Sequence, residues 1–198
     1  MNPAELRNNL FPVFLKVEKL RVLIVGGGNV GSEKLRLLLK SSPVAKVTLI
    51  ASEISDEITT LSLQFPNVVL VNRAFRPGDL DGENVVIAAT ENSGLNREIL
   101  ESAHEKNIIV NVADTPELCD FYLGSIVTKG DLKIAISTNG KAPTFAKRLR
   151  EFLEETLPDD LQKVIDNLSN IRSKLKGDFA NKIKVLNEIT SNLVSKHG

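Results

Sequence analysis

The sequence is poor in the residues that build disulfide frameworks and metal clusters. It has one cysteine, Cys119, no tryptophan and two histidines, His104 and His197, among 198 residues. A single cysteine excludes a disulfide within the chain, so a reduced compartment is the simplest interpretation and we expect a cytoplasmic protein. Cys119 has no histidine close to it in the sequence, so the pattern indicates neither a zinc cluster nor a histidine-based triad.

An excess of charge of either sign is also missing. Lys and Arg total 25, Asp and Glu total 25, and the pI is about 6.8, so no general attraction to nucleic acid or to a membrane surface follows. No apolar run approaches the ~20 residues of a membrane span. The first twelve residues include Pro, Glu and three Asn, so we expect no signal peptide.

Short β-branched runs alternate with helical patterns over the first two-thirds of the chain. The expected strands are residues 22–25, 46–50, 68–71, 85–89 and 108–112, and the expected helices are 29–41, 55–64 and 92–106. Continuous apolar strands of this length are typical of a parallel sheet that is buried on both faces. The pattern predicts an α/β protein with a Rossmann-type doubly wound parallel sheet.

The pattern changes after Asp114. Strand-like residues 125–128 and 132–137 flank a Lys-Gly-Asp turn, which predicts a hairpin, and three helical stretches follow. Pro143 opens the first helix, Gly177 closes the second, and the third runs from about Phe179 to Lys196. We therefore expect a dinucleotide domain over 1–113, a small central β region over 114–142 and a helical domain over 143–198.

The first predicted strand runs into a glycine-rich turn, VLIVGGGNVGSEKLRLLLK, at residues 22–40. Gly26, Gly28 and Gly31 give the spacing G-x-G-x-x-G between a buried strand and a helix. Such glycines permit a tight turn, close approach of a pyrophosphate to the backbone, and close packing of helix on strand. The free N–H groups of the helix N-terminus then attract the phosphates, so we predict a dinucleotide site.

An acid should follow the second strand to bind the ribose hydroxyls. Here the strand ends in LIASEIS, where Glu53 is the best ribose partner, although it could instead cap the next helix. No Arg or Lys lies between Ala51 and Leu63 to bind a 2′-phosphate, which favours NAD over NADP.

Asp114 follows the fifth predicted strand, at the sheet edge where open α/β folds bind ligands. A nicotinamide would point toward that edge, so Asp114 is a candidate for catalysis. The alternative is an ordinary turn residue that caps a short helix over residues 116–119.

Two long stretches resemble the siroheme-synthase dehydrogenase/ferrochelatase family. They are NNLFPVFLKVEKLRVLIVGGGNVGSEKLRLLL and NVADTPELCDFYLGSIVTKGDLKIAISTNGKAPTFAKRLRE, and the likeness runs from about Asn9 to Glu155. Members of the family are precorrin-2 dehydrogenases, and many are also sirohydrochlorin ferrochelatases. Some relatives carry a fused methyltransferase domain, which we do not expect here because the sequence stops at Gly198.

The resemblance implies an NAD-dependent homodimeric enzyme with a strand-swapped central region, in which Asp114 is the catalytic residue. It implies a tetrapyrrole substrate, precorrin-2 or sirohydrochlorin, with Fe²⁺ as a further substrate of the chelatase reaction. Thr138 falls where some relatives have a serine that can be phosphorylated and lines the tetrapyrrole pocket. The expected cofactor-binding residues are Gly26, Gly28, Asn29, Val30, Gly31, Ser52, Glu53 and Thr90.

The substrate of this family carries eight carboxylates and requires cationic partners. Lys141 is the best candidate, ahead of Lys147, Arg148 and Arg150, some of which a helix would turn away. Asn111 and Thr138 complete the expected substrate-binding set. Two alternatives stay open: a different NAD-dependent oxidoreductase, and a non-catalytic NAD(H)-sensing module that uses its helical tail to bind a partner.

Overall fold

The computed structural model describes residues 8–176 and 179–191, which group into two compact units. One unit holds the residues up to Gly124 together with Ser137–Pro143, and the other holds Ser125–Ile136 and the residues from Thr144 onward. The predicted three-region division is not tested by this grouping and stays a prediction. Gly177, the end of the third helix at Lys196, and His197 lie outside the described residues.

The first unit is a five-stranded parallel sheet in the order β3-β2-β1-β4-β5. The strands are β1 (Arg21–Val25), β2 (Lys46–Ala51), β3 (Val68–Asn72), β4 (Val85–Ala88) and β5 (Ile109–Val112). The helices are α1 (Asn29–Ser41), α2 (Asp56–Ser62) and α3 (Ser93–Glu105), and short 3₁₀ turns lie at Val17–Lys19, Pro77–Leu80 and Pro116–Leu118. The predicted Rossmann-type fold is confirmed.

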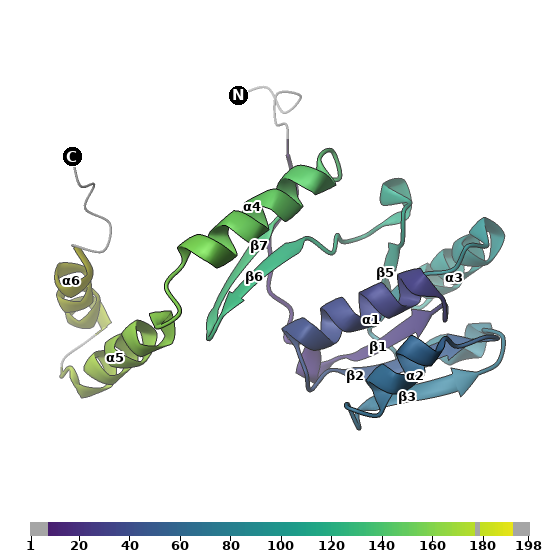
Figure 1. Cartoon of the computed structure of the whole chain (residues 1–198), viewed down its shortest axis with the longest axis horizontal. Coiled ribbons are helices and arrows are strands. Elements are labelled where there is room, and N and C mark those ends of the chain that lie inside the picture. Colours follow the sequence, from purple (N-terminus) through teal and green to yellow (C-terminus); the bar gives the residue numbers. More distant parts are fainter. Residues whose placement is uncertain (1–7, 177–178, 192–198) are drawn as a thin grey trace. The chain divides into compact units, whose positions relative to one another are not determined.

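Successive side chains of each strand enter two different cores, because side chains alternate across a sheet. Val22 and Ile24 of β1 pack in one core with Leu35 of α1 and Ile58 of α2. Their neighbour Leu23 packs in the other core, with the α3 residues Ile99 and Ala103 among others. Helices therefore cover both faces of the sheet (Figure 1), as the continuous apolar strands predict.

The second unit pairs a small antiparallel hairpin with helices. β6 (Ser125–Lys129) and β7 (Leu132–Ile136) are joined by a two-residue turn, and Gly130 adopts φ +58° there. The helices are α4 (Pro143–Thr156), α5 (Leu161–Lys174) and α6 (Phe179–Thr190). Gln162 accepts the Asp131 N–H at 2.7 Å and donates to the Asp131 carboxylate at 3.0 Å, which fixes the hairpin turn against the start of α5.

The buried carboxylate of Glu83 lowers the stability of the folded state. Glu83 lies beside β1, and its Oε2 atom is buried without a hydrogen-bond partner among the described residues. Burial raises the pKa of Glu83, and the nearby Arg21 guanidinium only partly opposes this. The folded-state pKa therefore lies above the unfolded one, so the folded state gains stability as the pH falls and loses it as the pH rises.

We expect Glu83→Gln to stabilise the protein at neutral pH, because the amide has the same shape and needs no buried charge. The midpoint of thermal unfolding should rise by roughly 1–3 °C, the shift that a fraction of a kcal/mol gives in a protein of this size. The gain should shrink as the pH falls through the raised pKa of Glu83, and it should vanish below the ordinary carboxyl pKa of 4.5, where the side chain is protonated in both states. Thermal melts from acid to neutral pH measure this, with the exposed Glu105→Gln as control; a lower midpoint at neutral pH would refute the account.

Candidate functional site

The carboxyl ends of the parallel strands bring the predicted site residues to one edge of the sheet. β1 ends before Gly26, β2 ends before Ser52, Thr90 follows β4, and Asp114 follows β5. β1 lies between β2 and β4. The strand order therefore runs from β1 toward β3 on one side and from β4 toward β5 on the other, and reverses direction between β1 and β4. That is the point at which open α/β sheets form a ligand crevice.

Two of the three motif glycines are required by the fold of the turn itself. Gly26 has φ +128°, and a Cβ on it would clash with the carbonyl oxygen of Ala89 after β4. A Cβ on Gly31 would clash with the carbonyl oxygen of Gly26, so α1 can approach the turn only without a side chain there. Both positions match the predicted tight turn and close helix packing.

Gly28 differs because nothing in the protein fills the space beside it. It is the N-cap of α1, it has no left-handed backbone angle, and a Cβ built on it would meet no atom within 4 Å. The open space lies at the first turn of α1, where the N–H groups of Asn29, Val30 and Gly31 have no partner within the helix. This cradle suits a pyrophosphate, since the N–H groups and the helix dipole favour negative charge.

The loop after β2 lies against the same turn. The Ser55 N–H donates to the Gly27 carbonyl oxygen at 3.0 Å, and a Cβ on Gly27 would clash with the Glu53 carbonyl oxygen. Ser52 and Glu53 are exposed beside the turn. The cap of α2 is Ser55, whose hydroxyl accepts the Ile58 N–H at 3.4 Å, so the interpretation of Glu53 as a helix cap is wrong.

Asp114 is held in a left-handed backbone conformation, with φ +58°. Its side chain is exposed, and its carboxylate has no hydrogen-bond or ion-pair partner among residues 8–176 and 179–191. The N-cap of the short Pro116–Leu118 helix is Thr115, and no side chain bonds there. The alternative role of Asp114 as a cap is therefore not found, and its carboxylate is exposed to solvent.

Asn111 of β5 and Cys119 of the following loop are held together by hydrogen bonds. Asn111 is 6% exposed, and its amide donates to the Phe121 carbonyl oxygen at 2.8 Å and to Cys119 Sγ at 3.4 Å. Cys119 Sγ lies 3.1 Å from the Val112 carbonyl oxygen, and burial raises the pKa of its thiol. The thiol is thus a neutral packing group, and Asn111 offers little surface to a substrate.

Thr90 is tied to α3 at the same edge. Its hydroxyl donates to Asn96 Oδ1 at 2.6 Å, and the Asn96 amide donates back to the Thr90 carbonyl oxygen at 2.9 Å. A cavity of about 250 Å³ lies close by, lined by Ser93, Gly94, Asn96, Arg97, Val112, Thr115, Glu117 and Leu118. Arg97 lies in α3 and Glu117 in the short helix after β5, and neither belongs to a sequence motif that predicts a site.

The predicted substrate residues Thr138 and Lys141 share one turn. The Lys141 N–H donates to the Thr138 carbonyl oxygen, and the Ala142 N–H donates to the Thr138 hydroxyl, each at 3.1 Å. A Cβ on Gly140 would lie 3.9 Å from Pro116 Cγ, so this turn approaches the loop that carries Asp114. Lys141 is exposed there.

Two of the three cations further along α4 form ion pairs with glutamates of the same helix. Arg148 pairs with Glu151 at 3.0 Å, and Arg150 pairs with Glu154 at 2.6 Å. In the described part of the chain no group of three or more His, Cys, Asp or Glu could hold a metal ion. None of the helices described is both long and apolar enough to cross a membrane.

Two family models match consecutive parts of the chain. The model described as "Putative NAD(P)-binding" covers residues 13–125, and the model "Sirohaem biosynthesis protein central" covers residues 129–156. The first spans the sheet and the glycine turn, so a nicotinamide dinucleotide as cofactor is confirmed at the level of NAD(P). The second spans most of the hairpin and α4.

Curated relatives match over most of the chain. A "Siroheme synthase" of Psychrobacter cryohalolentis is 40% identical over 178 residues, which is 90% of this chain and 33% of the relative. A "Siroheme synthase" of Vesicomyosocius okutanii is 37% identical over 172 residues, which is 87% of this chain and 36% of the relative. The chain spans about a third of the length of the curated relatives it matches.

A solved structure supports the fold. "SirC, precorrin-2 dehydrogenase" aligns with a TM-score of 0.72 over 94% of this chain and 90% of that chain, at 22% sequence identity. The glycine turn, the strand order and these matches agree. The chain is a homologue of siroheme synthases and belongs to the putative NAD(P)-binding family.

Proposed function

We propose that the protein catalyses the NAD-dependent oxidation of precorrin-2 to sirohydrochlorin. The observation that carries the proposal is the position of Asp114, an exposed carboxylate without a partner among the described residues, beside the edge where β5 ends. The siroheme-synthase relatives and the precorrin-2 dehydrogenase structure support the choice of substrate.

The glycine turn would hold the cofactor. Gly28 leaves the space for a pyrophosphate, the N–H groups of Asn29, Val30 and Gly31 would donate to it, and Ser52 and Glu53 would meet the adenosine ribose. We propose NAD rather than NADP because no cation lies between Ala51 and Leu63. When bound, the oxidised nicotinamide supplies the hydride acceptor.

The oxidation also releases a proton, and Asp114 would accept it. The left-handed backbone costs most residues ~1–2 kcal/mol, and only Gly, Asn and Asp adopt it readily. An Asp at such a position can aim its carboxylate out of the turn without disturbing β5. Asn111 would act as a positioning residue, because its amide donates to the Phe121 carbonyl oxygen and to Cys119 Sγ and so holds the loop that follows Asp114.

Thr138 and Lys141 would bind the rim of the tetrapyrrole. Their turn approaches Pro116, two residues after Asp114, so the loop that carries them lies close to the loop of the proposed reaction centre. Lys141 would pair with a substrate carboxylate. The free thiol of Cys119 supports a reduced, cytoplasmic setting.

Fe²⁺ would be a second substrate rather than a resident metal. Its insertion into sirohydrochlorin releases two pyrrole protons, and the Asp114 carboxylate would accept them one at a time and pass each to solvent. The test is anaerobic incubation of the product with Fe²⁺, which should convert the sirohydrochlorin spectrum into that of the metallated ring. An unchanged spectrum would limit the proposal to the dehydrogenase step.

The dehydrogenase proposal is tested by anaerobic incubation of the protein with freshly made precorrin-2 and NAD⁺. We expect NADH absorbance to rise together with the sirohydrochlorin spectrum, and much more slowly with NADP⁺. Binding of NAD⁺ without turnover would instead favour the sensor alternative, and turnover only with another substrate would favour a different oxidoreductase.

We also propose that the protein is a homodimer. β6 and β7 form a sheet of only two strands, so each has an unpaired edge within the described chain. The segment before β1 exposes several large apolar side chains, namely Leu10, Phe11, Val13, Phe14 and Leu15. A second copy of the chain would pair the open strand edges and bury the exposed apolar side chains.

We expect sedimentation to give a dimer at micromolar concentration, and Phe11→Asp combined with Phe14→Asp to shift it toward monomer. These two side chains are 86% and 70% exposed, so the substitutions leave the folded core intact. Leu63→Asp is the control, because Leu63 is an 83% exposed apolar residue of the loop after α2. A wild-type protein that sediments only as a monomer would contradict the proposal.

A further inference from the structure

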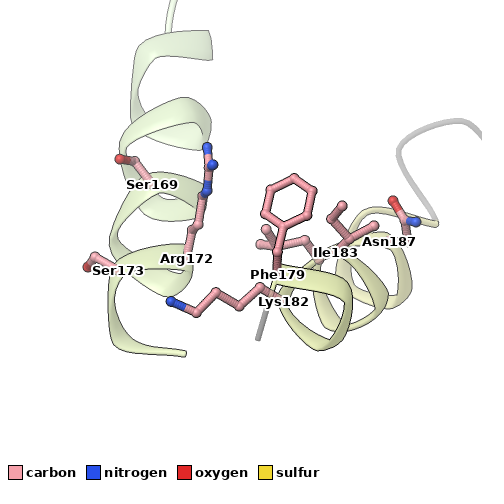
Figure 2. Close-up of a pocket in the computed structure, with 8 residues that line it drawn as sticks. Ser169, Arg172, Ser173, Phe179, Lys182, Ile183 and Asn187 are labelled. Atoms are coloured by element: carbon pink, nitrogen blue, oxygen red, sulfur yellow. The ribbon is translucent and has the colours of Figure 1, made fainter. Parts of the chain in front are cut away.

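A groove of about 790 Å³ lies between α5 and α6 in the helical unit, and nothing in the proposed reaction uses it. Figure 2 shows the two helices, with Lys182 extending from α6 toward α5 and Arg172 on the side of α5 nearer to α6. The lining residues are Ser169, Arg172, Ser173, Phe179, Lys182, Ile183, Leu186 and Asn187.

The two walls of the groove differ in polarity, unlike the facing surfaces of two packed helices. The α5 wall consists of Ser169, Arg172 and Ser173, which are all polar. The α6 wall carries Phe179, Ile183 and Leu186 at the spacing of one helical face. Helix pairs in proteins bury apolar faces against each other, so an apolar face opposite a polar one remains without a partner.

The groove is also positively charged. Arg172 and Lys182 have no ion-pair partner among the residues that the structure describes, and no Asp or Glu belongs to the lining. Phe179 is 70% exposed and Ile183 is 42% exposed on the opposite wall. An occupant that complements these walls must present an apolar face to α6 and carboxylates to the two cations.

We propose that this groove binds a flat, polycarboxylated tetrapyrrole, at residues other than those at the strand edge. The inference rests on the proposed function for the chemical class of the ligand. The ring face would lie on Phe179, Ile183 and Leu186, and carboxylates at the rim would pair with Arg172 and Lys182.

The size of the groove favours a small molecule over a peptide. A volume of about 790 Å³ falls within the ~300–1,000 Å³ of small-molecule sites. An acidic helix with a diameter of ~10–12 Å would fill the same volume with about one and a half turns, too short for the usual spacing of helix anchors. A ring of four pyrroles with its side arms matches the groove better.

The probe is uroporphyrin, a flat macrocycle with eight carboxylates whose binding is followed by absorbance and fluorescence. In the full-length protein with Lys141→Gln, which removes the cation proposed for the strand-edge site, Arg172→Gln combined with Lys182→Gln should weaken binding about tenfold, because each partly exposed ion pair contributes up to roughly a factor of five. Phe179→Ala should weaken it separately by removing the aromatic surface. The control is Lys163→Gln combined with Lys174→Gln, which removes two exposed α5 cations outside the groove.

Retention of wild-type affinity by the Arg172/Lys182 variant overturns the proposal, and so does an equal loss in the Lys163/Lys174 control. If sedimentation shows that the Arg172/Lys182 variant alters self-association without changing uroporphyrin binding, the groove is an interface between copies and the proposal is wrong. The NADH assay is independent of these results. A protein that binds uroporphyrin through the groove yet makes no NADH from precorrin-2 keeps this site and loses the proposed activity.

Discussion

Asp114→Asn should lower the rate of NADH formation from precorrin-2 by roughly 10²–10⁴, the range typical of losing a general base. Asparagine keeps the shape of the side chain and adopts the left-handed conformation that the backbone has here, with φ +58°. It cannot accept a proton at neutral pH. The affinity for NAD⁺ should be unchanged, because the cofactor turn lies at the end of a different strand.

At position 114, asparagine tests the chemical role of the carboxylate more directly than alanine does. Asp114 caps no helix, so no loss of a cap is expected from either change. Alanine, however, would add the cost of a left-handed backbone, ~1 kcal/mol or more, and mix a folding effect with the chemical one. Cys119→Ser is the control on the same loop and should change turnover little. An Asp114→Asn protein with near-normal turnover would make Asp114 an ordinary turn residue.

Gly28→Val should abolish NAD binding while the protein stays folded. The Cβ position of Gly28 has no protein atom within 4 Å, so the fold tolerates a side chain that would then occupy the space proposed for the pyrophosphate. Calorimetric titration with NAD⁺ measures the loss, and circular dichroism and the unfolding midpoint confirm the fold. Unchanged affinity in this variant would refute the site.

The neighbouring glycines provide the contrast. Gly26 requires φ +128°, and Gly31 lies against the carbonyl oxygen of Gly26. Alanine at either position should lower the unfolding midpoint as well as the NAD affinity. Only the Gly28 variant separates cofactor binding from folding, because only Gly28 is free of contacts with the rest of the protein at its Cβ position.

The order of strands and helices could be predicted because it depends on local sequence patterns. The run Val22–Val25 is apolar at every position, which requires burial on both faces, and the structure places Leu23 and Ile24 in different cores. The boundaries of α1 followed from the glycine turn and agree with Asn29–Ser41. The hairpin followed from Gly130, whose positive φ the turn requires.

The remaining features depend on contacts between distant residues. The Asp114 backbone angle has no local signal beyond the tolerance of Asp for it. Gly140 lies close to Pro116, although the whole β6–β7 hairpin separates them in the sequence. A local pattern of apolar and polar residues cannot predict such a contact. The mismatch of α5 and α6 is similar, since each helix alone has a regular apolar stripe and only their mutual rotation exposes Phe179 and Ile183.

The most direct measurement is the stoichiometry of a single anaerobic reaction of the wild-type protein with precorrin-2 and excess NAD⁺. Both NADH and sirohydrochlorin are followed in the same spectrum. The account predicts one NADH for each sirohydrochlorin formed, because the oxidation transfers one hydride to the cofactor and one proton to Asp114. Sirohydrochlorin that forms at the uncatalysed rate, with NAD⁺ bound but unreduced, would contradict it.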